Sequence, residues 1–108
     1  MENLEKYINK YQVTISFEIS EEPLPYLAAH RDYINEQIEN HVIEYYCVSV
    51  ESKRGWIIIN AQNKQEVLAC LQGSPLFKYW QYEIDELYTY DGQVYRLPSL
   101  QFNWLKIL

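Results

Sequence analysis

Two neighbouring residues, His30 and Arg31, are the first candidates for chemistry in this sequence. Histidine titrates close to neutral pH, and a positioned acid or base typically accelerates a reaction by ~10²–10⁴-fold. Arginine carries a permanent positive charge that suits a carboxylate or an enolate oxygen. Together the two side chains would fit a proton shift next to a carbonyl group.

A helix predicted over residues 25–40 positions this pair. Apolar side chains recur at helical spacing along one stripe, at Leu24, Leu27, Ile34 and Ile38. Arg31 falls inside the stripe and His30 flanks it, so both are expected to point toward a sheet. Because an unpaired guanidinium is costly to bury, Arg31 must reach a carboxylate, water or a ligand. Two alternatives stay open: a pocket between helix and sheet, or an Arg31 that extends to the rim above a merely hydrogen-bonded His30.

Three aromatic residues on predicted strands are candidates for ligand binding: Tyr46, Trp80 and Tyr82. Trp80 and Tyr82 alternate with polar residues along residues 79–87, so they share the face that meets the helix. Tyr46 joins them if the strand over residues 42–51 presents the same face. The tyrosine hydroxyls could donate to a ligand, and packing is the alternative role for these rings.

The first strand and a hairpin follow from alternation and turn signals. Residues 11–19 alternate between apolar and polar side chains, which predicts a strand with one core face. Residues 42–51 are rich in Tyr, Val and Ile. A turn over residues 52–55, with Gly55 at its end, predicts that residues 56–60 return beside them as a hairpin.

A second helix and a last strand complete the pattern. Asn63 and Glu66 form a plausible capping pair for the helix. Gly73 is expected to end it in the left-handed conformation, and Pro75 prevents its continuation. With the strand over residues 79–87, the order predicts an α+β, ferredoxin-like fold (split βαβ, βαββαβ). Two helices would cover one face of an antiparallel four-stranded sheet.

Length and charge limit the organisation and the partners of the chain. Its 108 residues predict a single domain over residues 1–108, with the ferredoxin-like core at 11–91. The formal net charge of −6 argues against nucleic acid and against a membrane surface as partners. No apolar run approaches the ~20 residues of a membrane span, and residues 1–6 do not resemble a signal peptide. We therefore expect the protein in the cytoplasm.

The sequence contains no motif for a metal or a cofactor. Cys47 and Cys70 are far apart and lack CxxC spacing, and His30 and His41 are the only histidines. A zinc site is therefore not expected. A glycine-rich phosphate loop is also absent. Any chemistry is expected to need no cofactor.

Two features predict self-association. Eleven Tyr and three Trp are more amphipathic rings than one small core can hide. A sheet with helices on one side also leaves its other face open. That face would carry Thr14, Ser16, Cys47, Gln81 and Glu83. We expect two copies of the chain to pair through it as a homodimer.

Residues 92–108 are expected to form a C-terminal docking arm. The segment includes Phe102 and Trp104 and is too apolar to stay in water. Pro98 interrupts any long helix in it. Either the arm crosses to a partner subunit or it folds back on its own, and both alternatives stay open.

Over residues 11–91 the chain resembles the muconolactone isomerase-like group of dimeric α/β-barrel proteins. The resemblance rests on three stretches: residues 66–71 continuing through Pro75-Leu76-Phe77 into 79–87, His30-Arg31-Asp32-Tyr33, and residues 52–56. It implies two protomers whose sheets face each other to close a barrel, with the helices outside, and assembly into larger rings in some members. No catalytic residue of the isomerase can be matched to a position here.

Two classes of function follow from these observations. The first is a cofactor-independent isomerase, or an enzyme like the small monooxygenases, that acts on a small carbonyl compound, lactone or aromatic compound. The second is a non-catalytic ligand-binding or assembly protein that retains the dimeric barrel. A helix-to-sheet cavity with His30 and Arg31 on its wall favours the first, and a cavity filled by Trp56, Trp80 and the arm favours the second. The fold alone does not decide between them.

Overall fold

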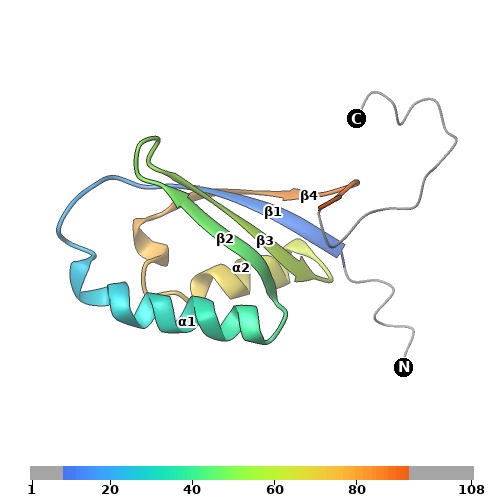
Figure 1. Cartoon of the computed structure of the whole chain (residues 1–108), viewed down its shortest axis with the longest axis horizontal. Helices are drawn as coiled ribbons and strands as arrows, with labels where there is room; N and C mark the ends of the chain where they lie inside the picture. Colours follow the sequence, from blue (N-terminus) through green and yellow to red (C-terminus); the bar gives the residue numbers. More distant parts are fainter. Residues whose placement is uncertain (1–8, 93–108) are drawn as a thin grey trace, which may run out of the picture.

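Four antiparallel strands form one sheet and two helices cover one of its faces in the computed structural model, which describes residues 9–92 (Figure 1). The elements follow the predicted order and confirm the α+β, ferredoxin-like fold. The strands are β1 (Asn9–Ser16), β2 (Ile43–Ser49), β3 (Arg54–Ala61) and β4 (Gln81–Glu86). The helices are α1 (Leu27–Glu39) and α2 (Lys64–Gln72), and two 3-10 turns, η2 (Leu24–Tyr26) and η3 (Phe77–Tyr79), precede α1 and β4.

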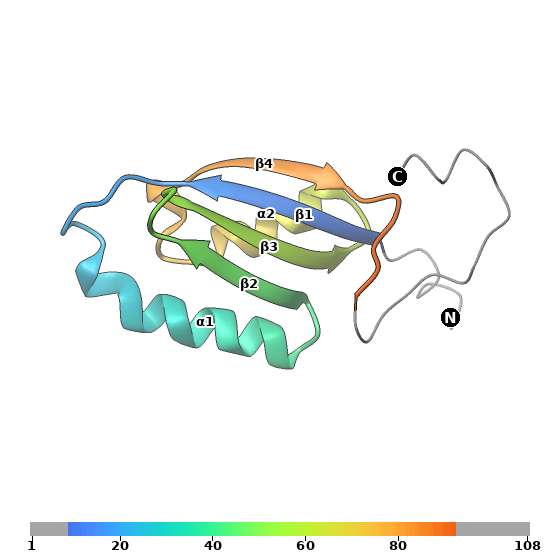
Figure 2. The same ribbon diagram turned by 45° about the horizontal axis from the view of Figure 1, so that its top comes forward.

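The core lies between the helices and the two central strands. The sheet order is β2-β3-β1-β4, so β1 and β3 each have a neighbour on both sides (Figure 2). Because side chains alternate across a strand, every second residue of β1 and β3 points at the helices. The core consists of Tyr11, Val13 and Ile15 of β1, Ile43 of β2, Ile57, Ile59 and Ala61 of β3, Ile34 of α1, and Val67 and Leu71 of α2.

Within the described residues the second face of the sheet is covered by no helix, and we term it the open face. It is formed by Gln12, Thr14, Ser16, Tyr45, Cys47, Trp56, Ile58, Gln81, Glu83 and Asp85. After β4 the chain stays close to the sheet. The Leu87 N–H donates to the Lys10 carbonyl at 2.9 Å, and the Tyr90 ring centroid lies 5.3 Å from the Lys10 ammonium nitrogen.

Helix α1 presents a different face to the sheet from the one that the apolar spacing predicted. Its buried residues are His30 and Ile34, whereas Leu27 is 44% exposed and Ile38 is 39% exposed. Arg31 is exposed, so placing Arg31 inside the buried stripe and His30 beside it is wrong. The reason is that α1 packs against β2, and the buried His30 finds hydrogen-bond partners in Tyr46 of β2 and in Ser74, which offset the cost of its burial.

Strand β2 contains a β-bulge. The pairing with β3 shifts by one residue between Ile43 and Tyr45, so Glu44 has no partner of its own in the ladder. Because the bulge takes up the extra residue, Tyr46 lies on the helix-covered face, as Ile43 does, and pairs with Ile57. Tyr46 therefore lies on the side of the sheet that was predicted to contact a ligand.

The hairpin between β2 and β3 is confirmed, but its glycine has another role. The left-handed residue of the turn is Lys53, with φ 59°. Gly55 lies inside β3, where an added Cβ would sit 3.0 Å from the Ile15 side chain and 3.1 Å from the Cys47 carbonyl oxygen. Gly55 is needed for this close approach and not for the turn.

Helix α2 begins as predicted and ends differently. The Asn63 side chain accepts a hydrogen bond from the Glu66 N–H at 2.9 Å. Gly73 has φ −71°, so the predicted left-handed ending is wrong. An added Cβ at Gly73 would overlap the ring of Tyr33, whose hydroxyl donates to the Cys70 carbonyl at 2.6 Å. The absence of a side chain at Gly73 thus lets the end of α2 pack directly against the Tyr33 ring of α1.

The first strand lies earlier in the chain than the predicted residues 11–19, because it begins at Asn9 and the chain leaves the sheet after Ser16. Residues 17–23 form a loop that arches out to η2 (Figure 1). The predicted docking arm lies outside the described residues, except for Gly92. In the described part of the chain, no helix has the length and apolar character needed to cross a membrane.

Candidate functional site

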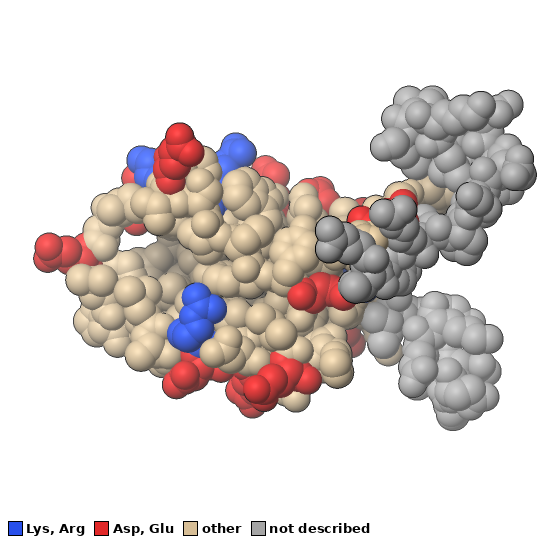
Figure 3. All heavy atoms as spheres, in the orientation of Figure 1, with Lys and Arg blue, Asp and Glu red and all other residues tan. Residues whose placement is uncertain are grey.

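A pocket of about 750 Å³ lies between α1 and the sheet. It is found at the end of the molecule where β1 and β2 finish, and the loop over residues 17–23 forms one side. Figure 3 shows the molecule hollowed at this end, where the loop stands away from α1. Small-molecule sites typically have volumes of ~300–1,000 Å³. The pocket is large enough for a small organic molecule.

His30 is the buried polar residue on the wall of this pocket, with 4% of its surface exposed. Its Nδ1 lies 2.7 Å from the Ser74 Oγ, and its Nε2 lies 2.8 Å from the Tyr46 hydroxyl oxygen. The ring also packs edge-on against Trp80, with 5.7 Å between centroids. Burial, and to a smaller extent the charge of Arg31, lowers the pKa of His30 to about 4. The imidazole is therefore neutral at pH 7.

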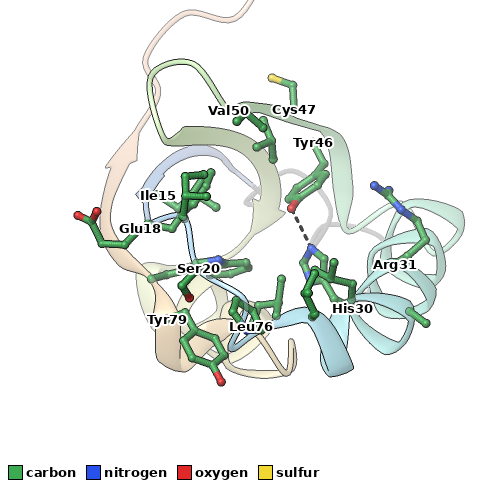
Figure 4. A pocket seen from close by; sticks show the side chains of 18 residues that line it. Ile15, Glu18, Ser20, His30, Arg31, Tyr46, Cys47, Val50, Leu76 and Tyr79 are labelled. Carbon is green, nitrogen blue, oxygen red and sulfur yellow. Dashed lines mark hydrogen bonds between the residues drawn. The ribbon is translucent and has the colours of Figure 1, made fainter.

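Tyr46 brings a hydroxyl group to the pocket wall. Figure 4 shows its ring reaching from β2 with the hydroxyl directed at His30. Burial raises the pKa of Tyr46, and the positive charge of Arg31 offsets part of this rise. The phenol is therefore protonated at neutral pH and can donate a hydrogen bond.

Arg31 lies at the rim of the pocket, beside Tyr46 (Figure 4). Its guanidinium carbon is 5.8 Å from the centroid of the Tyr46 ring, a distance typical of a cation–π contact. Among residues 9–92, no carboxylate forms an ion pair with Arg31. Its positive charge thus lies beside the ring of Tyr46 at the edge of the pocket.

Four of the five predicted site residues line the pocket: His30, Arg31, Tyr46 and Trp80. Tyr82 does not line it. Tyr82 points to the helix-covered side but packs on Phe77, with 5.5 Å between ring centroids. Alternation along a strand identifies the face on which a residue lies and says nothing of its distance from a pocket, which is why Tyr82 was included.

Ser74 belongs to the site and was not identified from the sequence. It is 4% exposed, and its Oγ accepts a hydrogen bond from the Leu76 N–H at 3.0 Å while it contacts His30 on the other side. The one available signal is its position between Gly73 and Pro75, where a short polar side chain often stabilises a turn. That signal does not point to His30, which lies 44 residues away in the sequence.

Exposed apolar side chains surround the mouth of the pocket. They are between 43% and 69% exposed and comprise Ile19, Leu24, Leu27, Val48 and Val50. Apolar groups gathered at a concave site favour a ligand that removes them from water. Leu24 and Leu27 were assigned to the core stripe, so the sequence did not reveal this role.

Within the described residues, Glu18 is the one acidic side chain that lines the pocket. Figure 4 shows it pointing away from the cavity, and its carboxylate lies 3.5 Å from the Lys53 ammonium nitrogen. No three His, Cys, Asp or Glu side chains of residues 9–92 come together as metal ligands. The described wall therefore offers a hydroxyl group, a positive charge and apolar surface, and no carboxylate that points inward.

Neither a scan against protein-family models nor a search of the curated proteins gives a match to this sequence.

Proposed function

We propose that the protein binds a small, largely apolar carbonyl compound in this pocket and promotes a proton shift next to the carbonyl without a cofactor. The observation that carries the proposal is the Tyr46 hydroxyl on the pocket wall, held by the buried His30 and flanked by the charge of Arg31.

Each polar group has a role in this proposal. Tyr46 donates a hydrogen bond to the carbonyl oxygen, and Arg31 stabilises the negative charge that develops there as the enolate forms. His30 contacts Tyr46 and acts by positioning it. Such donors act on the charge of the transition state, and removing one typically lowers the rate by ~10²–10³-fold.

The proton balance involves water. The C–H bond next to the carbonyl breaks, its proton passes to water, and its electron pair forms the enolate. Water is the acceptor because Glu18 points outward and both nitrogens of His30 are engaged. A proton from water then adds to the same carbon or to another carbon of the conjugated system. Both additions carry solvent hydrogen into the product.

Hydrogen exchange tests this proposal. In D₂O, the protein should speed deuterium incorporation beside the carbonyl of aryl ketones or lactones, which ¹H NMR measures. Tyr46→Phe should lower that rate by ~10²-fold, whereas Tyr45→Phe should not change it, because Tyr45 lies on the open face. If the wild type accelerates exchange in no member of such a panel, or if Tyr46→Phe is as active as Tyr45→Phe, the proposal fails.

A non-catalytic ligand-binding role is the second candidate. It is favoured by the engagement of both His30 nitrogens and by the low pKa of this residue, which make it a poor base. Saturable binding of ketones that depends on Tyr46, without faster exchange, would support this role over the enzymatic one.

We further propose that two copies pair through the open face as a homodimer, of the dimeric α/β-barrel kind, in the cytoplasm. The open face supports pairing because it mixes polar groups with the rings of Tyr45 and Trp56. Cys47 and Cys70 are both free thiols, which suits a reducing compartment.

A further inference from the structure

We infer that the hydrogen bonds of Ser74, His30 and Tyr46 run in one direction, toward the pocket, and that Tyr46 therefore offers its hydroxyl hydrogen to the ligand. The site then selects apolar compounds that present a hydrogen-bond acceptor, such as a ketone or lactone carbonyl, over compounds that present an N–H donor. This inference rests on the pocket of the proposed function, but it does not require a proton shift to occur there.

Ser74 determines the direction at the buried end of the chain of hydrogen bonds. Its Oγ accepts from the Leu76 N–H at 3.0 Å and lies 2.7 Å from His30 Nδ1. Within residues 9–92, Nδ1 is the one acceptor in reach of the Ser74 hydroxyl hydrogen. Ser74 is 4% exposed, so bulk water is not a substitute. Because a buried hydroxyl hydrogen without an acceptor is costly, Ser74 donates to Nδ1.

This assignment leaves His30 one tautomer. A neutral imidazole accepts at one nitrogen and donates from the other. Since Nδ1 accepts from Ser74, the ring hydrogen is on Nε2 and is donated to the Tyr46 oxygen at 2.8 Å. Tyr46 does not need its own hydrogen for this contact, and the hydrogen is left for a group in the pocket.

The opposite direction places the unsatisfied hydrogen where nothing can accept it. In that arrangement Tyr46 donates to Nε2, Nδ1 donates to Ser74, and the Ser74 hydroxyl hydrogen remains buried without an acceptor among the described residues. In the inferred direction the remaining hydrogen belongs to Tyr46, which lines an open pocket that water or a ligand can enter. The two directions thus differ by one buried unsatisfied donor.

Ser74 is therefore a positioning residue for the site. It does not line the pocket, yet it sets the tautomer of His30 and, through it, the polarity of the Tyr46 hydroxyl. Sites that hydrogen-bond a ligand strongly disfavour close analogues that cannot complete the bond. An acceptor on the ligand completes this bond, whereas an N–H would point at the Tyr46 hydrogen.

Nitrogen NMR of the imidazole of His30 tests the inference directly, without any ligand. In the full-length wild type at neutral pH, the hydrogen should be on Nε2 and Nδ1 should carry none. A hydrogen on Nδ1 would overturn the inference. This measurement needs no variant, so it holds even if a substitution at Ser74 prevents folding.

Two neutral bicyclic probes test the selectivity. 1-Indanone presents a carbonyl acceptor and indole presents an N–H donor, and NMR titration gives the affinity of each. The wild type should bind 1-indanone about tenfold more tightly than indole. Tyr46→Phe should abolish this preference. A wild type that binds the two probes equally, or prefers indole, contradicts the inference.

Substitution of Ser74 links the tautomer to the selectivity. Ser74→Ala should release Nδ1, populate both tautomers of His30 and reduce the preference for 1-indanone to less than about threefold. Ser52→Ala, in the exposed β2–β3 turn, is the matched control and should leave both readouts unchanged. A Ser74→Ala protein with an unchanged tautomer and unchanged selectivity would refute the positioning role. Selective binding without accelerated exchange would leave this inference intact and reject the proton shift.

Discussion

At the scale of single residues, His30 shows how burial and hydrogen bonding together determine a charge state. Its ring is almost fully removed from water, and its two nitrogens form hydrogen bonds with Ser74 and Tyr46. A protonated ring would need to donate from both nitrogens, which would disturb the hydrogen bond to Ser74. Burial and the charge of Arg31 therefore favour the neutral form.

The stability of the protein should fall in acid because of His30. The unfolded chain takes up a proton at this residue as the pH falls through 6.5, whereas the folded protein resists it until about pH 4. The free energy of unfolding should decrease between these pH values, by up to about 3 kcal/mol, and show no further loss from this group below pH 4.

Urea unfolding at several pH values can isolate this contribution. His30→Gln should remove it and flatten the dependence between pH 6.5 and 4. His41→Gln, which replaces the exposed histidine after α1, should retain it. Identical pH profiles for the wild type and His30→Gln would show that the pKa of His30 is not lowered by folding.

The sequence located His30 and Arg31 on the correct helix but exchanged their environments. Successive residues of a helix lie about 100° apart around its axis. Which of the two neighbours, His30 or Arg31, is predicted to be buried therefore depends on where the centre of the apolar stripe is placed. The exposed Leu24 and Leu27 shifted that centre, because apolar residues around a pocket mouth read like core residues. Ser74 could not be found, because its contact with His30 depends on the tertiary fold.

At the scale of elements, local signals predicted the strands and helices well, and the glycines less well. Alternation identified β1 and β4, and the pairing of Asn63 with Glu66 identified the start of α2. Gly55 and Gly73 were interpreted as conformational signals. Both glycines are required because another side chain lies close to them, Ile15 at Gly55 and Tyr33 at Gly73. These contacts depend on the tertiary structure and have no signal in the local sequence.

Gly73→Ala should destabilise the protein by about 1–3 kcal/mol, because the new Cβ would overlap the Tyr33 ring. The backbone at Gly73, with φ −71°, accepts alanine without strain, so a left-handed conformation is not the cause. In a Tyr33→Ala background the same substitution should therefore cost little. Chemical denaturation of the four proteins in this double-mutant cycle measures the coupling. Equal costs in both backgrounds would contradict the contact.

At the scale of the whole molecule, the two faces of the sheet differ in how they are covered. One face is buried beneath α1 and α2, and the open face mixes charged, polar, aromatic and apolar side chains. The order of elements was enough to predict this division, because a βαββαβ chain with short connections places both helices on one side. The size and position of the pocket were not predictable, because they depend on where the loop over residues 17–23 leaves the sheet.

Thr14→Arg should disrupt the proposed homodimer. Thr14 lies in the central strand β1, paired with Trp56 and Glu83 on the open face, and an arginine there would place a long, charged side chain between the two packed sheets. We expect association to weaken by on the order of a hundredfold, measured by analytical ultracentrifugation. Asn35→Arg, an exposed site on α1, adds the same charge outside the interface and should not weaken it. A wild type that sediments as a monomer at micromolar concentration would contradict the homodimer itself.

The bulge at Glu44 means that β2 can lose one residue without a change in its pairing with β3. Glu44 has no ladder partner of its own, and its exposed ion pair with Lys10 contributes little to stability. A chain that lacked this residue would still place Ile43 and Tyr46 two strand positions apart, and both would remain on the helix-covered face. Homologues one residue shorter here would thus keep the phenol in the pocket. Evolution can add or remove a residue at this point without redesigning the site.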